Sequence, residues 1–304
     1  MSALARRAFA AGAGLLVDRT LGDPPSSLHP VAGFGTLMGH LERLVWADRP
    51  TRGVAYAFAG TALGLASGAI VRSGTVALGV SAAGRQLRTT ARTIGAAVDV
   101  GDLAGARAAL PALVGRDPSE LDASGIAAAV IESVAENSVD AVIAPAFWTI
   151  VAGAPGALGY RAINTMDAMV GHRSERYGRF GTAAARLDDA ANWIPARLFA
   201  GLVIAVVPTA RREIVAAVRR DAPAHPSPNA GVAEAAMAAA IGRELGGPLR
   251  YGERVEHRPT LGVGPRPGTG DVEAAVRIAD RCELAFVGAC LAVAVVARVT
   301  RSRR

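Results

Sequence analysis

The chain has 304 residues, of which 51% are hydrophobic and 19% charged, and its mean hydropathy is +0.29. This composition is too apolar for a typical soluble enzyme and too polar for a transporter, so it favours a protein partly embedded in a membrane. The formal net charge is +7, and every basic residue is arginine. The absence of lysine excludes a Walker-type phosphate loop, a pyridoxal-phosphate Schiff base and a lysine nucleophile, because each needs that amine.

Charge-free windows place the candidate membrane segments along the chain. In chain order these apolar segments are 8–17, 53–71, 141–160, 192–210 and 284–297. The segment 192–210 is interrupted by Arg197, which either snorkels to the interface or faces an interior site. They predict an all-α, polytopic membrane protein with about four to five apolar segments, in which polar helices and ordered loops carry the site at the membrane face. The whole chain, 1–304, is predicted to form a single integral-membrane domain.

Two of these segments need separate interpretation. The first is short and follows two arginines, as in a signal peptide, but it lacks a convincing small-residue cleavage site, so a retained helix is predicted. The third contains Pro145 and the run Gly153-Ala154-Pro155-Gly156. This composition favours a broken or re-entrant hairpin over one straight span.

Polar stretches separate the apolar segments. In the helical region 85–140, a GRDP break precedes a predicted helix over Leu121–Ile131. The region 221–270 is rich in proline, glycine and serine, which predicts ordered loops around one helix, Val232–Leu245.

The first polar cluster is a series of acids in IESVAENSVD. Glu132, Glu136 and Asp140 recur every four residues and would form one helical stripe, with Asn137 beside it. Like charges at this spacing repel each other, so one interpretation is a solvated face beside the membrane. The other is a Mg²⁺ or Mg-nucleotide site, because a hard divalent cation binds several carboxylate and amide oxygens.

The second cluster lies in NTMDAMVGHRSERYGRFG. Asn164 and Asp167 are one helical turn apart and precede three arginines at intervals of three, Arg173, Arg176 and Arg179. The planar fork of arginine suits phosphate. A basic patch that holds anionic lipid head groups is the alternative, although the interleaved acid and Tyr177 are not needed for lipid attraction.

The third cluster lies in ARLDDAANWIPAR. Asp188 and Asp189 precede Asn192 at the next turn and can present oxygens to one cation, while Arg186 and Arg197 flank them. Either acid could instead be a helix cap or an arginine partner. Three such clusters in one short stretch of the chain favour a common site. Further on, in HPSPNAG, Asn229 either caps a helix or presents amides to an anion.

The motifs occur along the chain in the order GDP…HPV, GRDP, ESVAENSVDAVIAPAFW, GALGYRAINTMDAMVGHRSERYGRFG, ARLDDAANWIPARL, HPSPNAG and LGGPLRYG. In these motifs the chain resembles the adenosylcobinamide-phosphate synthase family of cobalamin biosynthesis (CobD/CbiB). The resemblance covers nearly the whole chain. The block Ile131–Arg197 is highly specific, whereas residues 54–112 match only in hydropathy.

The resemblance implies an integral membrane ligase. Such an enzyme amidates a propionic carboxyl of adenosylcobyric acid with (R)-1-amino-2-propanol O-phosphate and uses ATP and Mg²⁺ to give adenosylcobinamide phosphate. Its implied location is the inner cell membrane, as a multi-pass protein with the site on the cytoplasmic side. Membrane lipid and other membrane enzymes of the pathway are the expected partners, and nucleic acid is not expected to bind.

On this hypothesis the polar residues take three roles. The catalytic residues are expected to be Glu132, Glu136, Asp188 and Asp189, one of which takes the proton of the amine. The metal ligands are expected to be Glu136, Asn137, Asp140, Asp167, Asp188 and Asn192. The residues expected to bind substrate and phosphate are Asn164, Arg173, Arg176, Tyr177, Arg179, Arg186, Arg197 and Asn229.

Two other classes of protein fit parts of the pattern. Acids and asparagines at helical spacing beside membrane segments also suit an intramembrane Mg-dependent prenyltransferase, which needs an isoprenoid diphosphate and no ATP. A non-enzymatic corrinoid transporter or scaffold is the other alternative, and it predicts that the acidic residues are dispensable for amidation.

Overall fold

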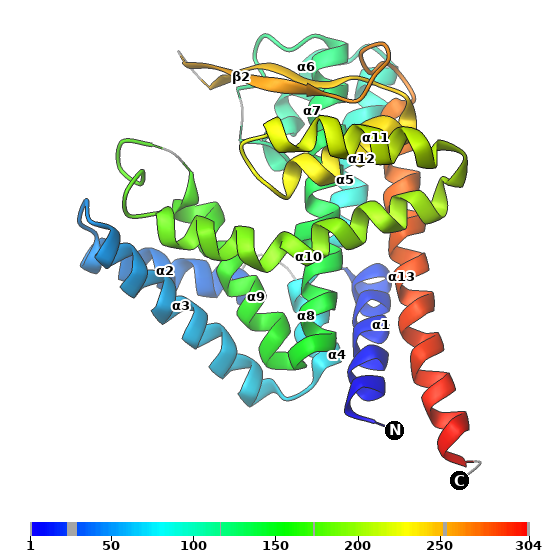
Figure 1. Ribbon diagram of the computed structural model, residues 1–304. Coiled ribbons are helices and arrows are strands. Elements are labelled where there is room, and N and C mark those ends of the chain that lie inside the picture. The colour runs from blue at the N-terminus through cyan, green and yellow to red at the C-terminus, as the bar shows by residue number, and fades with distance from the viewer. Residues whose placement is uncertain (1, 23–28, 116, 173, 252–253, 303–304) are drawn as a thin grey trace. The chain divides into compact units, whose positions relative to one another are not determined.

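A computed structural model describes residues 2–22, 29–115, 117–172, 174–251 and 254–302. The described chain is almost entirely helical, with one short β-hairpin, so the predicted all-α fold class is confirmed (Figure 1). The chain divides into two compact units. Unit 1 comprises Met1–Ala83, Asp140–Asn192 and Phe286–Arg304, and unit 2 comprises Gly84–Val139 and Trp193–Ala285. That the whole chain acts as one membrane domain stays a prediction.

Unit 1 is built from helices that begin at clear local signals. Ser2 and Ser73 each accept a backbone hydrogen bond at a helix start, and proline opens the second and third helices. The helices are α1 (Ala3–Leu21), α2 (Pro30–Val45), α3 (Pro50–Val71), α4 (Gly74–Ser81), α8 (Ala144–Ala152), α9 (Ala154–Met166) and the first part of α10 (Thr182–Val206). The last part of α13 (Asp271–Ser302) also belongs to unit 1.

The apolar segment 141–160 is broken, as the sequence predicts. Helix α8 ends at Ala152 and α9 begins at Ala154, and Gly153 between them has a φ of 70°. A left-handed φ of this kind favours glycine, and Pro155 then opens the new helix. The break leaves two short helices packed against each other, as Figure 1 shows.

Helices α3 and α9 pack closely because small residues line their contact. A Cβ atom added at Gly64 would lie 2.6 Å from the Cβ of Ala162 and 2.7 Å from the carbonyl oxygen of Leu158. Gly60 and Gly68 face α9 in the same way, one turn to either side. Small residues at this spacing let two helix backbones approach, as is common in membrane proteins.

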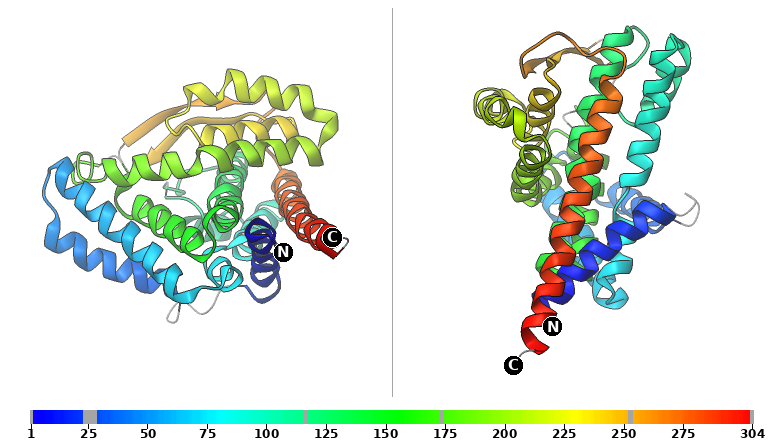
Figure 2. Two further views of the ribbon diagram at one scale, coloured as in Figure 1. Left: turned by 60° about the horizontal axis from the view of Figure 1, so that its bottom comes forward. Right: turned by 90° about the vertical axis from the view of Figure 1, so that its right-hand side faces the viewer.

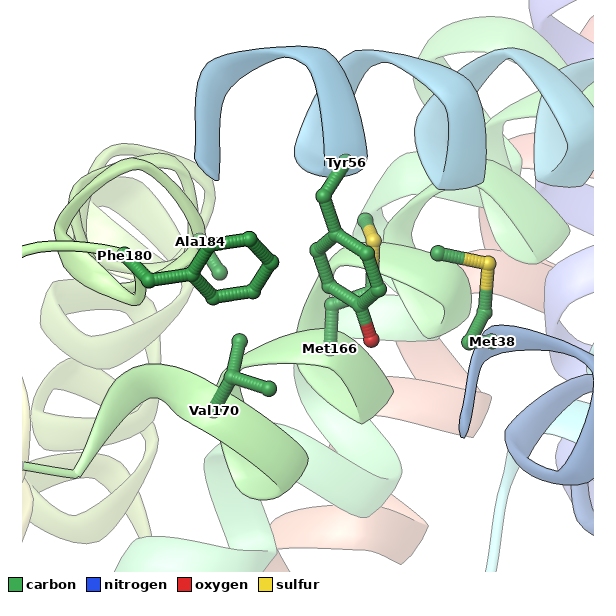
Figure 3. Close-up of a cluster of buried hydrophobic side chains, with 6 residues drawn as sticks. All are labelled: Met38, Tyr56, Met166, Val170, Phe180 and Ala184. Carbon is green, nitrogen blue, oxygen red and sulfur yellow. The ribbon is translucent and has the colours of Figure 1, made fainter. Parts of the chain in front are cut away.

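A buried cluster fixes the other end of the α3–α9 pair (Figure 3). The Tyr56 ring lies between Phe180 and two methionine side chains, and its centroid is 5.3 Å from that of Phe180. The members of this core are Met38, Tyr56, Met166, Val170, Phe180 and Ala184. The cluster ties α2, α3 and α9 to the start of α10 within unit 1.

Among the residues that the structure describes, three helices are long and apolar enough to cross a membrane: Pro50–Val71, Thr182–Val206 and Asp271–Thr300. They contain or overlap the predicted segments 53–71, 192–210 and 284–297. The segment 8–17 lies inside α1. With these spans and the shorter apolar helices, the chain is a polytopic membrane protein.

Unit 2 combines helices with the hairpin. Asp122 accepts a hydrogen bond from Gly125 and caps α7 (Ala123–Ser138), which extends well beyond the predicted 121–131. The other elements are α5 (Gly84–Asp99), α6 (Leu103–Ala109), the second part of α10, α11 (Arg211–Arg220), α12 (Ala230–Ile241), β1 (Leu245–Tyr251), β2 (Arg254–Leu261) and the first part of α13. Short 3₁₀ turns lie at Leu110–Ala112, Pro208–Ala210 and Ala222–Ala224.

The hairpin corrects the prediction of ordered loops around one helix. Helix α12 stops at Ile241, because Gly242 adopts the left-handed conformation, and the antiparallel strands β1 and β2 follow. Leu245 and Leu261 pair at the open end of the hairpin and are fully buried. Burial of this apolar pair overrides the turn-like composition that glycine and proline give the sequence. The strands contact α12, which in turn packs on α11 (Figure 2).

Candidate functional site

A group of polar side chains in unit 1 lies where α9, α10 and the segment before α8 meet. We call it the acid–amide cluster, and it consists of Asp140, Tyr160, Asn164, Asp188 and Asn192. The side-chain nitrogen of Asn164 donates to Asp140 Oδ2 at 3.1 Å and to Asp188 Oδ1 at 3.2 Å. One amide group therefore bridges two carboxylates that come from different parts of the sequence.

Asp188 is held on both of its oxygens. The side-chain nitrogen of Asn192 donates to Asp188 Oδ2 at 2.9 Å, and the Tyr160 hydroxyl donates to Asn192 Oδ1 at 2.9 Å. Asp188 is 8% exposed, Asn192 1% and Tyr160 2%. Hydrogen bonds from N–H groups to a buried carboxylate are strong, so the network fixes the orientation of Asp188.

Helical spacing explains how the sequence delivers these groups. Tyr160 and Asn164 are four residues apart on α9, and Asp188 and Asn192 are four apart on α10, so each pair shares one helix face. The sequence pattern already predicts the second pair. Tyr160 was not predicted to belong to the cluster, although its four-residue spacing from Asn164 is a signal that could have placed it there.

Asp140 reaches the cluster through a π-helical segment, Val139–Ile143, which follows α7 directly. The predicted stripe of Glu132, Glu136 and Asp140 on one regular helix is therefore wrong at its third member. A π turn contains an additional residue, so it rotates the following side chains away from the four-residue period. Single π turns of this kind are frequent at functional sites.

The donor set of the cluster fits Mg²⁺. Two carboxylates supply hard oxygen atoms, and Mg²⁺ in proteins commonly uses one or two carboxylates together with water and substrate phosphates. Within the part of the chain that the structure describes, no three His, Cys, Asp or Glu side chains form a metal-binding group. A cation here would be held by Asp140 and Asp188, with water completing its shell, because Asn164 and Asn192 direct their amide nitrogens at these carboxylates.

Two of the arginines that follow α9, Arg176 and Arg179, pair with carboxylates of unit 1. Arg176 donates to Glu42 at 2.7 Å and lies 4.6 Å from the centroid of the Trp46 ring, and the Tyr177 hydroxyl donates to the same carboxylate at 3.4 Å. Arg179 pairs with the exposed Asp48 at 3.5 Å. That these residues bind phosphate stays a prediction.

The remaining predicted residues of unit 1 lie as follows. Arg186 is exposed on α10, and Asp189 is half-buried on the same helix. Asp167 opens a second π-helical segment, Asp167–Gly171, and its carboxylate lies against Gly171. Arg173 lies outside the described residues.

In unit 2 two predicted residues on α7 have local contacts. Glu132 is 3% exposed and accepts a hydrogen bond from the backbone nitrogen of Gly246 at 2.8 Å, which anchors β1. Asn137 donates to the carbonyl and hydroxyl oxygens of Ser133. Glu136 is exposed on the same helix.

Arg197 and Asn229 meet in unit 2. Arg197 donates to Asn229 Oδ1 at 2.8 Å and to the Pro228 carbonyl oxygen at 3.2 Å, and it lies over the Trp193 ring. Asn229 makes no side-chain capping bond at the start of α12. Ser227 accepts from the backbone nitrogen of Ala230 instead, so the capping role considered for Asn229 is wrong.

Comparison with known proteins agrees with the resemblance seen in the motifs. A family model described as CobD/Cbib protein matches residues 11–279. The chain belongs to the CobD/Cbib family. This stretch includes every predicted site residue in both units. No solved structure matches this member of the CobD/Cbib family.

Curated relatives of this CobD/Cbib chain carry the name cobalamin biosynthesis protein CobD. A protein from Mycobacterium tuberculosis is 44% identical, over 86% of this chain and 88% of the relative. A protein from Rhodobacter capsulatus is 41% identical, over 92% and 94% of the two chains. A protein from Chromobacterium violaceum is also 41% identical, over 92% and 95%.

Proposed function

We propose that this chain is an ATP- and Mg²⁺-dependent acid–amine ligase of cobalamin biosynthesis. It joins adenosylcobyric acid to (R)-1-amino-2-propanol O-phosphate and yields adenosylcobinamide phosphate. The observation that carries the proposal is the family match over residues 11–279, supported by relatives named for cobalamin biosynthesis. The acid–amide cluster supports it further, because it offers an oxygen-rich site for a cation beside membrane helices.

The reaction needs an activated carboxyl group and a free amine. Mg²⁺, when bound, would neutralise charge on the transferring phosphoryl group. In this proposal Asp140 and Asp188 hold the cation, while Asn164 and Asn192 keep the two carboxylates in place. Orientation matters because a displaced reacting group can cost orders of magnitude in rate.

The bonds exchanged define what the residues must do. A carboxylate oxygen of the corrinoid attacks the terminal phosphorus of ATP, and ADP leaves. The amine nitrogen then forms the amide bond with the acyl carbon, inorganic phosphate leaves, and one of the predicted catalytic carboxylates accepts the amine proton. An acyl adenylate route would release AMP and pyrophosphate instead, so the nucleotide product tells the two routes apart.

The amine substrate comes from another protein in this proposal. Decarboxylation of an amino-acid phosphate with pyridoxal phosphate requires a lysine Schiff base, and the chain has no lysine. A separate decarboxylase therefore supplies the aminopropanol phosphate. Decarboxylation by the purified chain in the presence of pyridoxal phosphate would contradict this statement.

An amidation assay on detergent-purified protein tests the proposal. The protein is given adenosylcobyric acid, aminopropanol phosphate and Mg-ATP, and the corrinoid and nucleotide products are followed by mass spectrometry. Product that depends on all three substrates is expected. Absence of product from folded protein, or transfer of an isoprenoid diphosphate without ATP, would contradict it.

A further inference from the structure

Arg161 lies on α9 beside the acid–amide cluster but is absent from the predicted phosphate-binding arginines. It follows Tyr160 directly, and its Nη1 donates to Asn164 Oδ1 at 3.2 Å. The side chain is half-buried. Its guanidinium group therefore lies one hydrogen bond away from the amide that joins Asp140 and Asp188.

The guanidinium of Arg161 has N–H donors that form no hydrogen bond with the described residues. Its Nε is buried and has no hydrogen-bond partner among the residues that the structure describes. A buried polar group left without a partner destabilises the fold, so such groups in native proteins are usually satisfied by a ligand or by water. The only hydrogen bond of its side chain to the described residues is to a neutral amide.

Two of the predicted phosphate-binding arginines of unit 1 differ in this respect. Arg176 and Arg179 are paired with the carboxylates of Glu42 and Asp48. A phosphate that binds them must compete with a carboxylate already in place. Arg161 requires no such exchange, because a ligand can occupy donors that the fold leaves open.

We propose that Arg161 contacts a phosphate oxygen of a substrate bound at the acid–amide cluster. The inference rests on the proposed function, which supplies phosphate as the ligand. The planar guanidinium fork matches phosphate geometry, and a cation held by Asp140 and Asp188 would neutralise the other side of the same group. Both substrates carry a terminal phosphoryl group, so the group that Arg161 contacts belongs either to the nucleotide or to the phosphorylated amine.

Binding measurements on the full chain in lipid nanodiscs test this inference without requiring turnover. Calorimetric titrations use a non-hydrolysable ATP analogue with Mg²⁺, 1-amino-2-propanol phosphate, and unphosphorylated 1-amino-2-propanol. They compare wild type with Arg161→Gln and Arg161→Lys. The matched control is Arg72→Gln, which changes an exposed arginine at the C-terminal end of α3 in the same unit.

The Kd of one phosphate ligand is expected to rise at least about tenfold in Arg161→Gln, which corresponds to about 1.4 kcal/mol. Arg161→Lys recovers part of this loss, because lysine keeps the charge but lacks the fork. The ligand that responds identifies the phosphate. Binding of the unphosphorylated amine, and all binding by Arg72→Gln, stays within about twofold of wild type.

Three results would overturn the inference. The first is wild-type affinity of Arg161→Gln for both phosphate ligands. The second is an equal loss for the phosphorylated and unphosphorylated amines with no loss for the nucleotide, since that pattern reports only a positioning role through Asn164. The third result applies if Arg161→Gln does not fold. In that case Arg161→Lys is measured in its place, and wild-type binding of both phosphate ligands by Arg161→Lys would overturn the inference.

The outcome is separable from that of the proposed function. If the wild type makes no adenosylcobinamide phosphate and phosphate binding still depends on Arg161, the ligase proposal fails and this inference stands. If product forms and phosphate binding is indifferent to Arg161, only this inference fails.

Discussion

Asn164 is the residue on which the geometry of the cluster depends most directly. Its single side-chain nitrogen donates to carboxylates of both Asp140 and Asp188, and its oxygen accepts from Arg161. Two carboxylates close to one amide repel each other, and a bound cation relieves that repulsion. The bridge through Asn164 therefore holds the two carboxylates close together, and this proximity favours binding of a cation.

Replacement of Asn164 by alanine removes this bridge. We expect Asn164→Ala to lower the amidation rate at least about tenfold and to raise the Mg²⁺ concentration needed for half-maximal activity. The control is Thr165→Ala on the same helix, since the Thr165 hydroxyl bonds the carbonyl oxygen of Arg161 in its own helix. Equal Mg²⁺ titrations for the two variants would contradict the role given to Asn164.

Asp221 in unit 2 gives a prediction about pH. Burial alone would raise the pKa of this carboxyl, but hydrogen bonds from the Arg220 guanidinium and the Gly262 backbone nitrogen outweigh it, and the pKa is lowered below its ordinary 3.8. A pKa that is lower in the folded state stabilises the fold above the unfolded-state pKa. This contribution is lost as the pH falls through the folded-state value.

The comparison of Asp221→Asn with wild type tests this predicted direction of the pH dependence of stability. At pH 7 the variant should melt at a lower temperature, because the charged hydrogen bonds that hold β2 are weakened. The difference should shrink when the pH falls below about 4, where the wild-type carboxyl also becomes protonated. A difference in melting temperature that is constant from pH 7 to pH 3 would contradict the role of the ionised group.

The contact between α3 and α9 decides where Asn164 lies. Gly64→Ala would place a methyl group 2.6 Å from the Ala162 Cβ and 2.7 Å from the Leu158 carbonyl oxygen, so the helices must separate. We expect this variant to lose about 1–3 kcal/mol of unfolding free energy and to lose activity as well. Unfolding followed by tryptophan fluorescence in detergent measures the loss.

Gly33→Ala on α2 is the matched control for this substitution. A Cβ at Gly33 meets nothing within 4 Å, and alanine is the better helix former by about 0.5–1 kcal/mol. This variant should be as stable as wild type or more so. If both glycine variants lose the same stability, close helix packing is not what Gly64 provides.

Local sequence patterns predicted some elements well and others poorly. The break at Gly153 and the shared face of Asp188 and Asn192 follow from proline, glycine and four-residue spacing, which act within a few residues. The π segment that contains Asp140 does not, because its hydrogen-bond pattern depends on packing that no single window contains. The hairpin after α12 was missed for the same reason, since Leu245 and Leu261 become strand partners only when both are buried.

For the molecule as a whole, composition and motifs predicted a helical membrane protein of the CobD/Cbib family, and both are confirmed. The polar clusters were harder to assign. The sequence treats the arginines after α9 as one phosphate-binding group, yet Arg176 pairs with Glu42, more than a hundred residues away in the sequence. Such distant pairs cannot be seen in spacing, whereas the three-residue spacing of Arg161 and Asn164 on one helix was a signal that could have placed them together.

In the proposed function, Mg²⁺-dependent amidation takes place at Asp140 and Asp188. The most direct test is the rate of adenosylcobinamide phosphate formation from adenosylcobyric acid, aminopropanol phosphate and Mg-ATP by wild type, Asp188→Asn and Asp48→Asn. Asp48 is the control, because it is an exposed acid of the same unit that pairs only loosely with Arg179. We predict Mg²⁺-dependent product from wild type and Asp48→Asn, and a rate at least about tenfold lower from Asp188→Asn. Equal rates for all three folded proteins, or no product from wild type, would contradict the account.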